Sequence, residues 1–221
     1  MVFTDQIKRL EQVYSALLDF RPGAPPLSLD WGQSEAGGEL IPVPPIDNRV
    51  GAKDEPVSPP PAIGRVRGAI GLGSGWVLDL MVLPPLDVDG YVAGQSGIAI
   101  EYGAAIGALS ASLRAFYTQG VVRGPITAPG VLDAFTLENN GGDGRVAWTV
   151  GALSVYAGLG AGWSRTRLEI ASDGSLSAAA FPYSYGFAGA AWRSGLWRVT
   201  VEQQQTESYL SHIVLTASHG F

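Results

Sequence analysis

A two-residue alternation of apolar and polar side chains runs from Gly64 to the C-terminus and constrains the fold more than any other feature. In 109–118, for example, Leu113 and Tyr117 alternate with Ser112 and Arg114. Successive side chains of a β-strand point to opposite faces, so the alternation predicts strands with one apolar and one polar face. We expect eight strands: 65–72, 97–106, 109–118, 145–151, 153–167, 182–192, 196–204 and 209–221.

The predicted connections between these strands alternate between short and long. Gly107-Ala108 and Gly151-Ala152 make short turns, whereas 73–96, 119–144 and 168–181 are long. Transmembrane barrels have tight turns at one rim and long loops at the other. The pattern therefore predicts an all-β fold, a closed antiparallel up-and-down transmembrane barrel of about eight strands. Trp76–Leu83 is apolar enough to be an additional strand, which leaves a ten-stranded barrel as an alternative.

The composition agrees with a chain that has few solvated faces. Charged residues make up 15% of the 221 residues, against about 25% in typical soluble domains, and 30 residues are glycine. The net charge of −6 gives no basic surface for nucleic acid, and the absence of cysteine excludes disulfides and thiol chemistry. No apolar run is long enough for a transmembrane helix.

The N-terminal part differs from the rest, so we divide the chain into 1–21, 22–63 and the barrel, 64–221. Apolar residues at spacings of three and four predict an amphipathic helix over 4–20, and the prolines of 22–63 predict a linker or docking segment. We expect the helix on the periplasmic side, because the first strand should start there. It would bind a periplasmic partner, fold against the barrel rim or fill the lumen.

No signal peptide is visible at the N-terminus. Met1–Phe20 carries charged residues, among them Lys8 and Glu11, where an apolar segment should lie. An outer-membrane location therefore requires that the signal has been removed or that the chain starts upstream.

Four stretches of the predicted barrel have an order and spacing that can be compared with those of known barrel families. They are Val66–Gly71, Val155–Gly162, Tyr185–Glu202 and Ser211–Phe221. The second has a Tyr-x-Gly-x-Gly-x-Gly pattern. Together they resemble the eight-stranded outer-membrane barrels of the opacity-protein and OmpA type. The resemblance covers 64–221 and implies a Gram-negative outer membrane, contact with lipid and lipopolysaccharide, and recognition of the terminal Phe221 by the barrel-assembly machinery. His219 stands where an aromatic residue is expected.

The polar faces of the predicted strands place several charged residues in the lumen. They would line a narrow ion path or, as we favour, form a salt-bridge network that fills a small barrel, because buried charges must be paired. Gly158, Gly160 and Gly162 fit a crowded interior. The lumen charges are Arg65, Arg67, Glu101, Arg114, Arg198 and Glu202.

Aromatic residues on the apolar faces predict a girdle at the membrane interface, and the alternative is ordinary core packing. The residues are Trp76, Trp148, Trp163, Trp192 and Trp197. Ser211 and His212 alternate to opposite faces, and no acidic partner is suitably spaced, so no catalytic site, metal or cofactor is predicted. The loop 119–144 carries Glu138 and Asp143 but identifies no ligand.

The sequence therefore favours a non-enzymatic outer-membrane scaffold with surface loops for interaction and a periplasmic N-terminal arm, with a minor porin-like activity open. One alternative is a soluble β-barrel that binds a small apolar ligand. Another is a β-rich subunit of a secreted or virion assembly.

Overall fold

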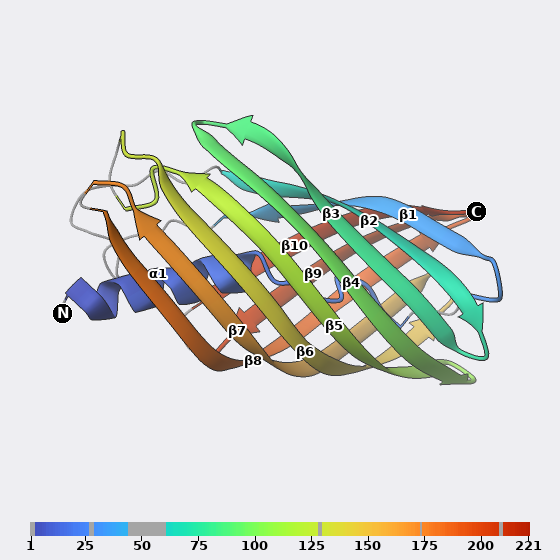
Figure 1. The fold of residues 1–221 in the computed structure, drawn as a ribbon. Coiled ribbons are helices and arrows are strands. Elements are labelled where there is room, and N and C mark those ends of the chain that lie inside the picture. Colours follow the sequence, from blue (N-terminus) through green and yellow to red (C-terminus); the bar gives the residue numbers. More distant parts are fainter. Residues whose placement is uncertain (1–2, 27–28, 44–60, 128–129, 173, 208–209) are drawn as a thin grey trace.

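Ten antiparallel strands close into a barrel around a short helix in the computed structural model, which describes residues 3–26, 29–43, 61–127, 130–172, 174–207 and 210–221 (Figure 1). Strand β1 pairs with both β2 and β10, which closes the barrel. The elements are α1 (Phe3–Leu17), β1 (Ser34–Pro42), β2 (Ala62–Gly73), β3 (Trp76–Val88), β4 (Tyr91–Ile106), β5 (Leu109–Gly124), β6 (Asp133–Val150), β7 (Leu153–Ile170), β8 (Ser175–Ser194), β9 (Trp197–Thr206) and β10 (Leu210–Gly220).

The closed antiparallel barrel is confirmed, but the count of eight strands is wrong. One additional strand, β1, lies in the segment predicted to be a linker, so the barrel begins at Ser34 rather than Gly64. Gly37 and Gly38 deprive β1 of apolar alternation. The other, β3, is the strand of the ten-stranded alternative. Its register shifts between Leu83 and Leu86, so Pro84 and Pro85 interrupt the pairing without ending the strand.

The long connections are shorter than expected, because most of each predicted loop is strand, whereas the two-residue turns at Gly107-Ala108 and Gly151-Ala152 are confirmed. Gly73–Ser96 holds β3 and part of β4, and the loop predicted at 119–144 shortens to 125–132. Gly151 and Gly195 have φ of 59° at their hairpin turns, a conformation that glycine adopts without strain.

The barrel has two distinguishable ends. At the turn end lie Ser34, Phe221 and the two-residue connections 74–75, 107–108, 151–152 and 195–196 (Figure 1). At the opposite end, the loop end, β1, β3, β5, β7 and β9 finish and β2, β4, β6, β8 and β10 begin. Residues 44–60, within the predicted docking segment, and Tyr209 lie outside the described residues.

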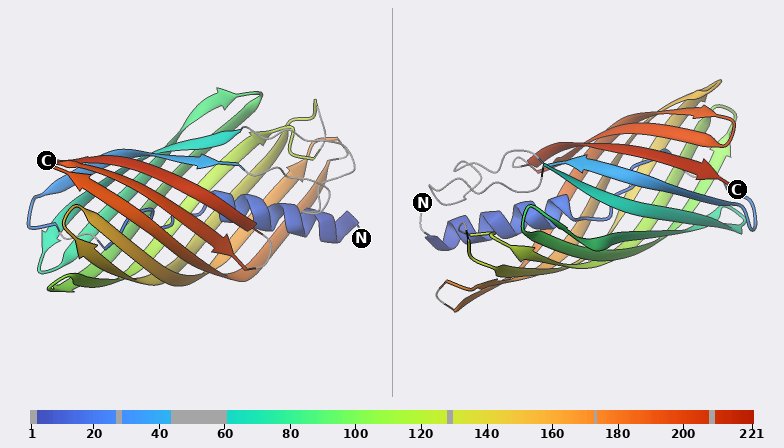
Figure 2. Two further views of the ribbon diagram at one scale, coloured as in Figure 1. Left: turned by 180° about the vertical axis from the view of Figure 1, so that it is seen from behind. Right: turned by 90° about the horizontal axis from the view of Figure 1, so that it is seen from above.

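The N-terminal segment threads the whole lumen before the first strand begins. Helix α1 lies inside the loop end, and the chain then runs through the barrel to the turn end (Figures 1 and 2). There Gly32 N donates to Gly71 O (3.1 Å), and β1 starts back along the wall. The helix therefore lies at the end opposite the start of β1. The expectation that the helix and the start of the first strand share one side of the barrel is wrong. The helix fills the lumen, as one of the alternatives allowed.

An apolar core surrounds α1 in the loop-end half. The helix contributes Leu10, Val13 and Leu17 at the predicted spacing, and the barrel wall encloses them. Wall residues of this core include Leu83, Val122, Phe135, Leu137 and Leu168. The helix ends at Leu17, where this apolar lining gives way to polar side chains.

Candidate functional site: the charged lumen and the segment it holds

The structure places the six charged residues predicted for the lumen on the inner face of the wall. Glu101 and Glu202 are fully buried, and Arg67, the most accessible of the six, keeps only 11% of its side chain exposed. The others are Arg65, Arg114 and Arg198. None of the six occupies an open path, because residues 18–25 of the threaded segment are also buried.

Carboxylates that the sequence interpretation missed pair with these arginines. Asp143 accepts from Arg114 (2.9 Å). It was missed because 119–144 was assigned to a loop, although β6 extends through it and its alternation continues to Arg145. The pairs are Arg65 with Glu39, Arg67 with Glu39 and Asp79, Arg114 with Asp143, and Arg198 with Glu35 (2.7 Å). The predicted Glu101 pairs with Arg145, an arginine that was not predicted for the lumen.

The same arginines also bind the threaded segment through its main chain. Five wall side chains donate to carbonyl groups of residues 18–24, and we call these five residues the backbone clamp. The pairs are Gln95 to Leu18, Arg65 to Asp19 (2.8 Å), Arg114 to Phe20 (2.6 Å), Arg67 to Arg21 (3.1 Å) and to Pro22, and Arg145 to Ala24 (2.5 Å). Residues 18–24 lie beyond α1, so these buried carbonyls need donors from the wall.

Two side chains of the segment add specific contacts. The ring of Phe20 lies between the guanidinium groups of Arg67 (4.9 Å) and Arg114 (5.1 Å). Arg21 lies over the ring of Tyr185 (4.4 Å) and donates to Thr206 Oγ1 (2.6 Å). Cation–π contacts of this kind strengthen when they are shielded from water.

A row of inward-facing aromatic rings covers the glycines of β7. Tyr183, Tyr185 and Phe187 of β8 are all buried and turn into the lumen. A Cβ at Gly160 would lie 2.2 Å from Tyr185, and corresponding contacts arise at its two glycine neighbours, Gly158 and Gly162. These glycines therefore leave space for the rings, which is the crowding expected of this strand.

The outer face of the turn-end half is an apolar belt. Leu159 is 75% exposed and Leu113 70% exposed, although both are large apolar residues. Of the predicted girdle, Trp76, Trp148, Trp192 and Trp197 lie near the turn end on this face. Trp163 is instead in the middle of β7, in register with Asn140 and, beyond it, Tyr117. Other exposed members of the belt are Ile98, Ile100, Val146, Val155, Val199, Val201 and Leu215.

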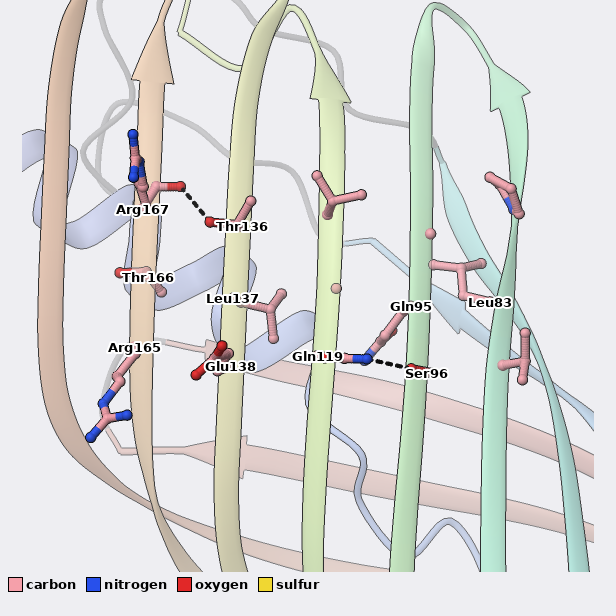
Figure 3. A pocket seen from close by; sticks show the side chains of 15 residues that line it. Leu83, Gln95, Ser96, Gln119, Thr136, Leu137, Glu138, Arg165, Thr166 and Arg167 are labelled. Carbon is pink, nitrogen blue, oxygen red and sulfur yellow. Dashed lines mark hydrogen bonds between the residues drawn. The ribbon is translucent and has the colours of Figure 1, made fainter.

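The outer face of the loop-end half is polar on β5, β6, β7 and β9. A depression of about 700 Å³ crosses strands β3 to β7 here, with α1 behind them (Figure 3). Glu138 and Arg165 lie in register with each other on β6 and β7, at one side of it. Thr136, Glu138, Arg165 and Arg167 line the β6–β7 side of it, and apolar side chains such as Val82, Pro85 and Val121 line the β3–β5 side. Exposed polar residues of this half include Gln119, Arg123, Thr136, Arg167, Gln203, Gln205 and Glu207.

The remaining candidates lie on β10. Ser211 is exposed and His212 is buried, so they face opposite sides as expected. Phe221 is exposed, its main chain pairs with Ser34, and its ring contacts His219 (5.0 Å). Within the described ranges, no group of three or more His, Asp or Glu residues could hold a metal ion, and no helix is long and apolar enough to cross a membrane.

Comparison with known proteins leaves the family open. No family model matches the chain, and no curated protein matches it. Among solved structures it is similar to Ail, the attachment invasion locus protein of Yersinia pestis, at 10% identity over 86% of this chain and 99% of Ail, with a TM-score of 0.36. It is also similar to the translocator domain of the autotransporter NalP from Neisseria meningitidis (11% identity, 98% and 94% coverage, TM-score 0.41). For the Acinetobacter baumannii outer membrane protein Omp33 the values are 10%, 88%, 100% and 0.36.

Proposed function

We propose that this chain is an outer-membrane barrel whose turn-end half spans the bilayer and whose loop-end half projects into water. The observation that carries the proposal is that polar and apolar side chains exchange faces of the wall between the two halves of the barrel. The turn-end half is charged inside and apolar outside, whereas the loop-end half is apolar inside and, on β5, β6, β7 and β9, polar outside. A soluble ligand-binding barrel would have a polar outer wall along its whole length.

The height of the apolar belt supports a bilayer as its solvent. On β7 the belt runs from Leu153 to Trp163, after which Arg165 and Arg167 face outward. Ten steps of about 3.3 Å give roughly 33 Å along the strand. At a tilt of about 40° this is roughly 25 Å along the axis, the height of the apolar band in outer-membrane barrels.

The proposed role is that of a membrane scaffold that presents an interaction surface. The loop-end connections and the depression around Glu138 and Arg165 would contact external partners, and the belt would contact lipid and lipopolysaccharide. Phe221, exposed at the turn end, remains the proposed signal for the barrel-assembly machinery. If the turn end faces the periplasm, the loop end, which holds α1, faces the outside. The helix would then lie away from any periplasmic partner.

A minor solute pore receives less support than the scaffold role. The segment 18–25 is buried in the lumen, and the cavity beside Ala24 holds about 30 Å³, room for about two water molecules. Conduction would therefore require the segment to move.

Folding in detergent or lipid tests the proposal directly. The chain, refolded in micelles or in phosphatidylcholine vesicles, should migrate faster on a denaturing gel when it is not boiled and should give a strong β signal in far-UV circular dichroism. In buffer without lipid it should aggregate. Equal folding in plain buffer, with no difference in migration after boiling, would sink the membrane assignment.

A further inference from the structure

The backbone clamp binds a feature that every polypeptide has. Its donors contact six carbonyl oxygens of residues 18–24, and each residue of any chain supplies one such oxygen. The side chains at Leu18, Pro22 and Ala24 contribute no hydrogen bond to this grip. This part of the recognition is therefore independent of the sequence of the segment, and the side chains of Phe20 and Arg21 add their own contacts.

The clamp is oriented by the wall and not by the segment it holds. Each of its four arginines is paired with a carboxylate on β1, β3, β4 or β6, and these pairs involve no residue of 18–24. Charge-assisted pairs of this kind fix the direction of the remaining N–H groups. A site whose donors are already oriented binds with less ordering cost when a ligand arrives.

The clamp also has unused donors. Arg65 Nε and Arg114 Nη1 are buried in the lumen and have no hydrogen-bond partner among the described residues. Both belong to side chains that are at least nine-tenths buried. The donor capacity of the site thus exceeds what residues 18–24 use, and this independently indicates a site built for acceptor-rich ligands.

The site also recognises the side chain at position 20 of the segment. Phe20 lies between Arg67 and Arg114, and its ring also contacts the wall at Gly97, where a Cβ would come within 2.8 Å of it. The site therefore favours an aromatic residue at this position.

We propose that the backbone clamp is a binding site for an extended polypeptide with one aromatic residue, which residues 18–24 occupy as a tethered ligand. When residues 18–24 leave the site, an extended segment of another polypeptide, with an aromatic residue at the position of Phe20, binds in their place. The inference goes beyond the scaffold role and holds whether or not the barrel lies in a membrane. Tethering gives residues 18–24 an effective concentration in the millimolar range, so they must be weakened before a free peptide can be observed.

The test uses the full chain with Phe20→Ala and Arg21→Ala, which remove side-chain contacts of the tethered ligand and leave the clamp intact. The matched control adds Ser15→Cys and Ser164→Cys, whose hydroxyl oxygens lie 2.8 Å apart, so that oxidation locks α1 to β7 in a chain that has no other cysteine. The probe is a fluorescent peptide of residues 16–26, and its binding is followed by anisotropy in detergent. A heat-modifiable band verifies that each protein is folded.

We expect saturable binding to the unlocked chain and at least about tenfold weaker binding to the oxidised, locked chain, because the tethered segment then cannot leave. A peptide scrambled around a fixed Phe-Arg pair should bind within about threefold, and a Phe-to-Ala peptide about fivefold more weakly.

A second set of probes leaves the protein unchanged. An ester in place of the amide after Phe20 weakens the carbonyl that Arg114 binds, and it should reduce affinity severalfold. The same ester after Gly23, whose carbonyl receives no clamp donor among the described contacts, should have little effect. Three results would each overturn the proposal: no binding to the unlocked chain, equal binding to the locked chain, or equal effects of the two esters.

Discussion

The two halves of the barrel reverse each other's distribution of polar and apolar side chains, and the threaded segment changes conformation where they meet. In the loop-end half it is a helix, which satisfies its own carbonyl groups and packs Leu10, Val13 and Leu17 against an apolar lining. In the turn-end half it is extended, and arginines of the lumen supply the donors that its carbonyls lack. The conformation of the segment thus follows the lining of each half, helical against apolar side chains and extended among charged ones.

The largest expected effect separates a buried ion pair from an exposed one. In Asp143→Ala, Arg114 loses its carboxylate inside the lumen, where neither side chain is exposed, and we expect a loss of about 3–5 kcal/mol in the free energy of unfolding. The control is Glu169→Ala, which breaks the pair with Arg167 (2.9 Å) on the outer surface of the loop-end half. That loss should be below about 1 kcal/mol. Urea unfolding in detergent measures both, and equal losses would contradict a buried charge network.

A charge placed on the outer wall distinguishes the solvents of the two halves. Leu159→Arg puts a guanidinium in the middle of the belt, and we expect a destabilisation of about 2–4 kcal/mol in lipid vesicles. Leu176→Arg makes the same change at an equally outward position of the loop-end half, where Leu176 is 54% exposed, and should cost less than about 0.5 kcal/mol. Similar costs at the two positions would show that the belt does not face lipid.

The inner and outer faces of one strand pair provide a smaller contrast. Gly160→Ala puts a methyl group 2.2 Å from Tyr185, which is fixed by a hydrogen bond to Asp143 (3.0 Å) and by Arg21 above its ring. The strain should cost about 1–3 kcal/mol. Gly186→Ala, in register with Leu159 on the lipid-facing side, should be nearly neutral, because its methyl group meets the flexible end of that side chain at 3.3 Å.

Thermal unfolding of the two glycine variants in detergent checks this contrast. If Gly186→Ala were the more damaging change, the assignment of the inner and outer faces of β7 and β8 would be reversed.

The contrast between the halves also explains how much of the molecule could be predicted from its sequence. Where the outer face is apolar, as in 109–118 and 153–163, the alternation identified the strands, and in 109–118 it also identified the inward charge of Arg114. It failed for β1, where Gly37 and Gly38 interrupt the alternation on both faces, and for the first half of β6, where polar residues such as Glu138 lie outside and Asn139 inside. Asp143 and Glu39 were missed for this reason. The clamp could not be predicted at all, because it pairs wall side chains with carbonyl groups of a distant segment.

The smallest expected effect concerns the docking of α1 in the loop-end half. Burial raises the pKa of the Glu11 carboxyl above its usual range, and Ser177, Lys8 and Thr166 offset this only in part. A carboxyl whose pKa is raised by folding stabilises the docked helix in its protonated form. The helix should therefore dock most firmly below the unfolded pKa of about 4.3 and loosen as the pH rises through the raised value.

Glu11→Gln keeps the size of the side chain and removes its charge, so it should abolish this pH dependence and protect α1 more strongly at pH 7. We expect a change of less than about tenfold in the hydrogen-exchange protection of the α1 amides. Mass spectrometry between pH 5 and 8, corrected for intrinsic exchange, measures it, with β7 as the internal reference. The same slope in Glu11→Gln and in the parent chain would show that Glu11 does not control the docking. In that case the apolar lining alone holds the helix, and the two halves differ only in their solvent.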